Sequence, residues 1–181
     1  MLKVRSARSR PRAQREATEI TELHGEAHPD VFQACLNLGA FYRSQGKYEE
    51  AERFLRRAID VGRELWHTEA PLVAPMSSLA TVYRDQGRYQ DALDGYAEVL
   101  RILRRDFDPR YFGTGNALAG QGMTLTELGR YEEAEAALTE SYRILAAEDH
   151  PNQQLAVDAL VGLYEAWGKS DQLREWLQKR E

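Results

Sequence analysis

Two histidines in the N-terminal part of the sequence have the spacing of metal ligands. His24 and His28 are four residues apart, the spacing that places two imidazoles on one helix face in zinc sites. Gly25 and Pro29 predict a loop at this point, and in a loop this spacing does not define one face. A His-Pro pair recurs at His150, and a repeated linker explains it without metal. We therefore expect no metal site.

A group of glycines could suggest a phosphate-binding loop. Gly113, Gly115, Gly120 and Gly122 lie close together in the sequence. A phosphate loop needs a preceding strand, and the P-loop type ends in Gly-Lys-Ser/Thr. The sequence shows neither feature. We interpret these glycines as positions where a helix packs closely against its neighbours and where its first turn is loosened.

Carboxylates could supply general acids and bases. They concentrate in short acidic runs (Glu49, Glu50, Glu52, Glu132, Glu133 and Glu135). These runs fall in the expected first turns of helices, where negative charge interacts favourably with the helix dipole. No pair stands out as acid and base, and no Ser/His/Asp or Cys/His arrangement can be assembled. The sequence predicts no catalytic residue and no cofactor, so an enzyme is the least favoured of three interpretations.

The elements that must position these groups are repeated. A Gly-Lys-Tyr segment at Gly46 recurs as Gly-Arg-Tyr at Gly87 and Gly129. A fourth, less similar copy begins at Gly168. A period of about 40 residues indicates a repeat array. In each copy the glycine permits the turn that ends one helix, the next helix begins at the following aromatic position, and an alanine lets that helix approach its neighbour.

A second repeated mark lies between these copies. Each of four leucines lies six residues before a proline: Leu23, Leu65, Leu103 and Leu145, before Pro29, Pro71, Pro109 and Pro151. Proline is tolerated in the first turn of a helix, so each proline predicts the start of a new helix. Helical spacing of apolar residues predicts helices over about 13–24, 30–45, 48–64, 72–86, 89–104, 110–128, 131–146, 151–167 and 170–179. The expected fold class is all-α.

The composition narrows the class of protein. The chain is 43% hydrophobic and 29% charged, which is typical of a protein that buries a core. No run approaches the roughly 18 apolar residues of a membrane helix, so no membrane insertion is expected. Cys35 is the only cysteine, which excludes an intrachain disulfide and favours a reducing compartment such as the cytoplasm.

The charge is unevenly distributed. Residues 1–15 contain six basic residues and no acid, and removing that charge from the formal net charge of −5 leaves −11 for residues 16–181. An acidic body argues against nucleic acid on the repeats. We expect residues 1–12 to form a disordered basic tail. Contact with nucleic acid or an anionic membrane, and a role as a targeting segment, remain alternatives; no apolar segment of a secretory signal follows.

The repeated residues resemble a known family. Leu38-Gly39, Tyr42, Gly46, Tyr48, Ala51 and Ala58 have the spacing of the tetratricopeptide repeat (TPR). The long period, the Leu36-Asn37-Leu38-Gly39 segment and the linkers before Pro29 and Pro151 resemble the kinesin-light-chain variety. The resemblance covers about residues 16–181; Gln121, Leu125 and Ser170 depart from the pattern. It implies a right-handed superhelical solenoid of antiparallel helix pairs, with a half repeat at 13–27 and repeats over about 28–67, 68–107, 108–149 and 150–181.

In this family the first helix of each repeat lines a concave groove, so the resemblance also implies groove positions. The residues that we expect to bind a partner there are Asn37, Arg43, Ser78, Arg84, Asn116 and Met123. Gln33, Ala40, Ala74, Thr81, Gly120, Thr126, Leu155, Ala159, Gly162 and Glu165 take the remaining groove positions. Arg43 and Arg84 occupy equivalent places, and an arginine there offers a fork of donors that suits a carboxylate.

The resulting interpretation is a non-catalytic scaffold or adaptor that binds a peptide or protein segment, acidic in character, in the TPR groove. The alternative is a regulatory TPR module of a larger signalling protein, with an internal segment in the groove. Trp167 and Trp176, with Leu173 and Leu177, are expected to close the last repeat. Weak self-association through the ends of the solenoid is expected as well.

Overall fold

The computed structural model describes residues 27–147 and 150–180 of the 181-residue chain. It divides into two compact parts, residues 1–82 and 83–181, and each part is considered by itself. The predicted basic tail 1–12, His24, and all of the half repeat 13–27 except its last residue lie outside the described residues.

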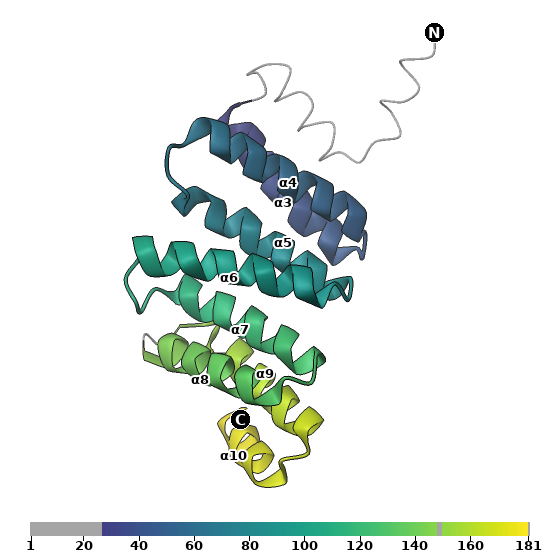
Figure 1. Cartoon of the computed structure of the whole chain (residues 1–181), viewed down its shortest axis with the longest axis vertical. Coiled ribbons are helices and arrows are strands. Elements are labelled where there is room, and N and C mark those ends of the chain that lie inside the picture. The colour runs from purple at the N-terminus through teal and green to yellow at the C-terminus, as the bar shows by residue number, and fades with distance from the viewer. Residues whose placement is uncertain (1–26, 148–149, 181) are drawn as a thin grey trace. The chain divides into compact units, whose positions relative to one another are not determined.

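Every regular element in the described residues is a helix. The α-helices are α3 (Pro29–Ser44), α4 (Tyr48–Leu65), α5 (Val73–Asp85), α6 (Tyr89–Asp106), α7 (Phe112–Glu127), α8 (Tyr131–Ala147), α9 (Gln153–Trp167) and α10 (Ser170–Arg180), and a 3-10 helix, η1 (Ala70–Leu72), precedes α5. The predicted all-α fold class is confirmed, and each predicted helix in these residues begins and ends within two residues of the observed one. Figure 1 shows α7 with α8 and α9 with α10 as antiparallel pairs.

The four recurring glycines end the first helices in the same way. Gly46, Gly87, Gly129 and Gly168 have φ values of 69°, 74°, 70° and 74°, a left-handed conformation that glycine adopts without steric cost. After each glycine, the next backbone N–H donates to a carbonyl five residues earlier, as from Lys47 to Tyr42 at 2.9 Å. This bond closes the last turn of the helix and satisfies its terminal carbonyl groups. One local rule thus produces all four turns.

The prolines mark helix starts less uniformly than predicted. Pro29 opens α3 as its first residue, with His28 as the N-cap. Pro71 lies inside η1. Pro109 and Pro151 lie in turns before α7 and α9, and after Pro109 the Asp108 side chain accepts a hydrogen bond from the backbone N–H of Arg110 at 2.8 Å. Pro109 and Pro151 therefore belong to the turns that lead into α7 and α9.

In the part that ends at Val82, α3 packs on α4. Leu38, Tyr42, Ala51 and Leu55 form a buried cluster with Val82 of α5. The close approach depends on a glycine, because a Cβ added to Gly39 would lie 2.5 Å from Cγ of Leu55. Next to it, Val31, Phe32, Cys35, Ala58 and Val61 form a second cluster. Tyr48, the first residue of α4, is half-buried beside the first cluster.

In the part that begins at Tyr83, helices α6 to α10 pack in chain order, and α7 contacts α6, α8 and α9 (Figure 1). The glycines of α7 explain this crowding. A Cβ on Gly120 would lie 2.4 Å from the Tyr96 ring of α6, and one on Gly122 would lie 2.5 Å from Leu138 of α8. The helix-packing interpretation of these glycines agrees with this geometry.

The last helix, α10, buries one large side chain against the rest of this part. Trp176 is buried and meets the Tyr142 ring edge-on, with ring centroids 4.9 Å apart. Trp167 stacks on Tyr131, and Lys169 lies over the Trp167 ring. Leu177 differs from the expectation because its side chain is 40% exposed. The tryptophans close this end of the part, while Leu177 faces solvent.

Candidate peptide-binding surface

Two of the predicted site residues meet in the part that begins at Tyr83. Arg84 lies in the last turn of α5 and Met123 lies on α7, 39 residues later, yet the Arg84 Nη1 atom is 3.4 Å from the Met123 sulfur. The other Arg84 terminal nitrogen, Nη2, donates to the Asp85 carboxylate at 3.2 Å. A guanidinium carries five N–H donors, so these two contacts leave donors that a ligand can use. The side chain is only 16% exposed and is therefore held in one place.

Asn116, a third predicted residue, pairs with a residue that the sequence reasoning missed. Asn152 precedes α9, and its side-chain N–H donates to the Asn116 side-chain oxygen at 3.0 Å. This bond uses one donor of Asn152 and one acceptor position of Asn116. The NH₂ group of Asn116 can still donate and the oxygen of Asn152 can still accept. Asn116 and Met123 are seven residues apart, so they lie on one face of α7.

The predicted residues of the other part lie on α3 and α5. Asn37 and Arg43 of α3 are exposed, and Ser78 of α5 is half-buried. Gln33 donates to the Asn37 side chain at 2.9 Å, which orders that amide along the helix. Asn37 and Arg43 are six positions apart in the helix, so the two side chains project about 120° apart. They therefore lie on adjoining faces of α3.

The groove positions implied by the resemblance are not all surface positions. Gly120 is buried beneath the Tyr96 ring and offers no surface to a ligand. The Thr126 hydroxyl donates back to the Gly122 carbonyl at 3.0 Å. In contrast, the Leu155 side chain is 41% exposed on the first turn of α9. Arg84, Met123, Asn116 and Leu155 are at least partly exposed in this part, and Asn152 joins them. Gly162 and Glu165 of α9 are exposed as well.

His28 and His150 have a role other than metal binding. Nδ1 of His28 accepts the backbone N–H of Asp30 at 3.2 Å, and Nδ1 of His150 accepts that of Asn152 at 3.1 Å. Each imidazole therefore satisfies an N–H at the start of a first helix. The His150 ring also stacks on Phe112, with centroids 4.7 Å apart. Across residues 27–147 and 150–180, no three His, Cys, Asp or Glu side chains gather into a possible metal site.

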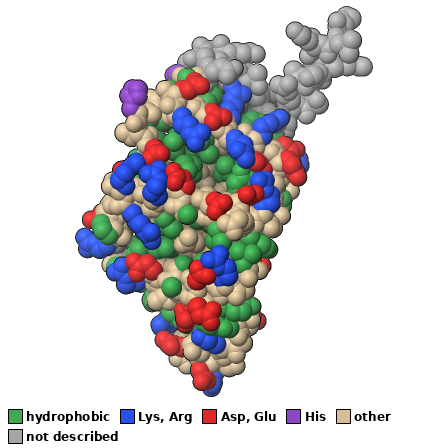
Figure 2. All heavy atoms as spheres, in the orientation of Figure 1, with side chains coloured by type: hydrophobic (Ala, Val, Ile, Leu, Met, Phe, Trp, Pro, Cys, Tyr) green, Lys and Arg blue, Asp and Glu red, His purple; other side chains and the backbone are tan. Residues whose placement is uncertain are grey.

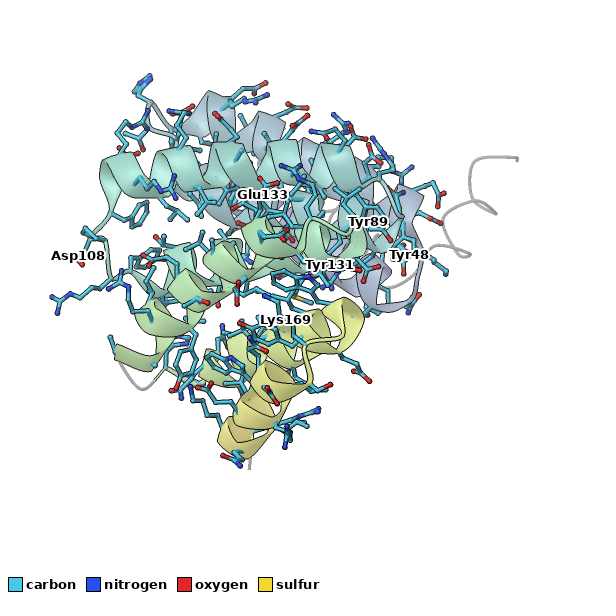
Figure 3. The ribbon with its side chains drawn as sticks, turned by 60° about the horizontal axis from the view of Figure 1, so that its bottom comes forward. Tyr48, Tyr89, Asp108, Tyr131, Glu133 and Lys169 are labelled. Atoms are coloured by element: carbon cyan, nitrogen blue, oxygen red, sulfur yellow. The ribbon has the colours of Figure 1, made fainter. Side chains whose placement is uncertain are left out.

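Several acidic side chains of the second helices are engaged in local ion pairs. Arg130 contacts both carboxylate oxygens of Glu133 at 2.7 Å, and Arg143 contacts Glu140 in the same manner. These hydrogen bonds hold the pKa values of both glutamates below their usual range. Figure 3 shows Glu133 in the first turn of α8, with Tyr89 and Tyr131 toward the same end and Asp108 at the opposite end. A carboxylate held in this way is a poor proton carrier.

One carboxylate joins two helices. Tyr164 of α9 donates its hydroxyl to Glu135 of α8 at 2.6 Å. Burial raises the pKa of Tyr164, and the hydrogen bond to Glu135 raises it further. The pair lies beside the buried Trp176 core, where it fixes the packing of α8 on α9. The hydrogen bond between Tyr164 and Glu135 therefore has a structural role.

None of the helices in the described segments is long and apolar enough to span a membrane.

Models of the tetratricopeptide repeat match residues 31–65 and 72–147. The human tetratricopeptide repeat protein 19, mitochondrial, is 33% identical over 87 residues, which cover 48% of this chain and 22% of that protein. Protein KINESIN LIGHT CHAIN-RELATED 2 of Arabidopsis thaliana is 22% identical over 157 residues, which cover 85% of this chain and 24% of that protein. This chain thus spans about a quarter or less of the length of these relatives.

A crystal structure of kinesin-light-chain repeats from Podosopora anserina, described as nearly identical TPR-like repeats, has a similar fold. It superposes with a TM-score of 0.75 at 19% identity, over 93% of this chain and 81% of that one. The family matches lie in both parts, and the observed helices and glycine turns recur with the period of the repeat. This chain therefore belongs to the tetratricopeptide repeat family.

Proposed function

We propose that this protein is a non-catalytic adaptor that binds a peptide or protein segment on the faces of its first helices. Tetratricopeptide repeat proteins generally act as scaffolds for protein interactions, and the family assignment supports that general role here. The proposal goes further in naming a surface and a chemistry. In the part that begins at Tyr83 the surface consists of Arg84, Asn116, Met123 and Asn152.

The contact between Arg84 and Met123 carries the proposal. The Met123 sulfur and the Asp85 carboxylate hold the guanidinium in a fixed position. Little side-chain entropy remains to be lost when a ligand binds there. A partner carboxylate would gain charge-assisted bonds, worth about 1.5–3 kcal/mol for a hydrogen bond to a charged group. The ligand that fits is an acidic segment or a C-terminal carboxylate.

Other groups on the same surface suit the remainder of such a segment. The Asn116 and Asn152 amides together offer a donor and an acceptor, the two functions that an extended backbone needs. Leu155 presents an exposed apolar side chain on α9. In the other part, Asn37, Arg43 and Ser78 offer a similar combination, which we propose as a second contact region.

A binding assay tests the proposal. The probe is a fluorescently labelled peptide with aspartate and glutamate residues and an unblocked C-terminus, and the readout is anisotropy. We expect Arg84→Gln to weaken binding about tenfold or more, because 1.4 kcal/mol corresponds to a factor of ten. Arg110→Gln is the matched control, because it removes the same charge from an exposed linker position. Equal weakening by both variants would reject the surface.

A pull-down with mass spectrometry would identify the partner. It would compare the wild-type chain with the Arg43→Glu/Arg84→Glu variant and with an Arg110→Glu/Arg174→Glu variant of the same net charge. A protein lost only with the first variant is the adaptor's partner. If no protein is lost, but an acidic segment from outside residues 1–181 of a longer form of this chain binds at Arg84, the regulatory-module alternative holds. The length of the relatives favours testing that alternative.

We propose the cytoplasm as the compartment, because Cys35 is a free thiol and the sequence offers no second cysteine for an intrachain disulfide, which suits a reducing compartment. We also propose weak self-association through α10, since Leu177 projects 40% exposed from the last helix. Sedimentation equilibrium would show it as a rising mean mass that Leu177→Glu abolishes. A strict monomer at high concentration would reject it.

A further inference from the structure

A second surface lies on the opposite helices of the part that begins at Tyr83. Helices α6 and α8 both pack on α7, and a groove runs between them with α7 as its floor. The groove has a volume of about 570 Å³, within the range of ligand sites. Leu118, Gln121 and Leu125 form the floor. Figure 2 shows the face that carries α6 and α8, with basic and acidic side chains interspersed over apolar ones.

Small side chains keep the groove open. Ala97 on the α6 wall and Ala136 on the α8 wall are both exposed, and their methyl groups do not fill the space between the helices. Leu118 and Leu125 are 4% and 5% exposed and are already part of the core. An occupant would therefore gain little from apolar burial, so polar recognition must supply the specificity.

Most charges along this groove are already paired. Arg130 binds Glu133, and Glu140 binds Arg143, each pair through two hydrogen bonds. Asp94, on the α6 wall, accepts a hydrogen bond only from the neutral Gln90 side chain. Arg104, at the other end of the same wall, makes no hydrogen bond or close ion pair with a described side chain, but its charge acts on Glu140 and helps to lower the pKa of that carboxyl. The wall therefore ends in a carboxylate and a guanidinium, neither of which is bound directly by a described side chain of opposite charge.

The spacing of these two charges sets the length of a ligand. Asp94 and Arg104 are ten helical residues apart, or about 15 Å along α6. Two residues four positions apart in an extended peptide are separated by about 13 Å and point to the same side. Long side chains on the peptide make up the difference between these two distances. A base and an acid at that spacing could reach both ends of the α6 wall.

The floor holds a group suited to a peptide backbone. Gln121 is half-buried between the walls, and its amide makes no hydrogen bond with a described residue. An amide can donate to a carbonyl and accept from an N–H. An extended peptide has such groups available, whereas a helix satisfies its own. This observation favours an extended occupant over a helical one.

We propose that the groove between α6 and α8 binds an extended peptide segment with a basic and an acidic residue four positions apart. The base lies at Asp94, the acid lies at Arg104, and Gln121 holds the main chain between them. The lining contains three acids and two bases, so a polyanion such as nucleic acid does not fit. This surface shares no residue with the Arg84 surface, so either can fail while the other stands.

The test is a nuclear magnetic resonance titration of the full chain with a blocked seven-residue peptide. The peptide has a lysine second, a glutamate sixth, and serine or threonine elsewhere. At millimolar peptide we expect shifts of the Ala97 and Ala136 methyl groups and of the Gln121 side-chain amide. Asp94→Ala and Arg104→Ala should each weaken binding at least fivefold. The neighbouring exposed residues give matched controls, Asp91→Ala and Arg105→Ala, which should change it less than twofold.

A change of specificity makes the test sharper. The Arg104→Glu variant should lose the lysine–glutamate peptide and gain a peptide with lysine at both positions. The proposal is overturned if the groove signals do not move at millimolar peptide, or if an uncharged serine and threonine peptide moves them equally. Shifts confined to Met123 and Asn116 would overturn it as well and would place the peptide on the Arg84 surface.

Discussion

At the scale of single residues, glycines inside helices differ in whether the surrounding packing requires them. Gly120 and Gly162 both lie inside α-helices, but their surroundings differ. A Cβ on Gly120 would lie 2.4 Å from the Tyr96 ring, whereas a Cβ on Gly162 would meet nothing within 4 Å. The identity of the residue is the same, and only the packing reveals which glycine is required.

This contrast predicts opposite effects for one substitution. Gly162→Ala should raise the free energy of unfolding by about 0.5–1 kcal/mol, because alanine loses less backbone entropy in a helix. Gly120→Ala should lower it by about 1–3 kcal/mol, because Tyr96 must move within a packed core. Urea denaturation of the two variants measures both changes. Stabilisation by Gly120→Ala would show that α7 and α6 are more loosely packed than in this structure.

Tyr164 gives a residue-scale prediction with a pH dependence. Its folded-state pKa is raised above the ordinary value of 10.0 by burial and by the hydrogen bond to Glu135. Below pH 10 the tyrosine is neutral in both states and the stabilisation is complete. Above pH 10 it ionises first in the unfolded chain, so the free energy of unfolding falls as the pH rises further.

The measurement compares wild type with Tyr164→Phe by urea denaturation between pH 9 and 11. At pH 9 the variant should be less stable by about 1 kcal/mol, the net worth of one hydrogen bond. The difference should shrink above pH 10, because only the wild type carries the raised pKa. Parallel curves across this range would mean that Tyr164 ionises as easily in the folded state as in the unfolded chain.

At the scale of elements, the sequence predicted where the helices lie but not which side chains of different helices contact each other. Turns such as the one at Gly46 depend on the residues within one turn, so in the described part of the chain their spacing predicted each α-helix boundary to within two residues. The contacts of Arg84 with Met123 and of Asn116 with Asn152 join residues 39 and 36 positions apart. Such contacts depend on how consecutive helices are stacked. The period indicates which helices are equivalent, but it does not indicate which side chains meet.

The groove between α6 and α8 was missed for the same physical reason. Its charged ends, Asp94 and Arg104, look like ordinary exposed residues of an amphipathic helix. They become distinctive only because the residues around them pair with each other, as Arg130 does with Glu133. A count of residue types does not show which charges are compensated.

The attachment of α10 gives the prediction at this scale. Trp176 is 7% exposed and is the one fully buried side chain among the residues of α10, whereas Leu177 is 40% exposed. Trp176→Ala should cost about 3–5 kcal/mol, and Leu177→Ala should cost well under 1 kcal/mol. Hydrogen exchange should show α10 losing protection before α7 in Trp176→Ala. Equal exchange in both variants would mean that Trp176 does not hold the helix.

At the scale of the whole molecule, a net charge of −11 over residues 16–181 opposes the binding of an acidic ligand. We expect contact at Arg84 to overcome this repulsion at physiological salt, because the two effects differ in range. The Debye length is about 8 Å at 0.15 M and about 30 Å at 0.01 M, so distant acids matter only when salt is low. A charge-assisted bond at contact distance is screened much less.

This difference in range predicts how the acidic peptide of the Arg84 assay responds to a remote charge change. The Arg110→Glu/Arg174→Glu variant lowers the net charge by four without touching the Arg84 surface. Its affinity should be within twofold of wild type at 0.15 M salt and clearly weaker at 0.01 M. Arg84→Gln should be weak at both concentrations. If the remote variant lost as much affinity as Arg84→Gln at 0.15 M, then net charge and not the local site would govern recognition.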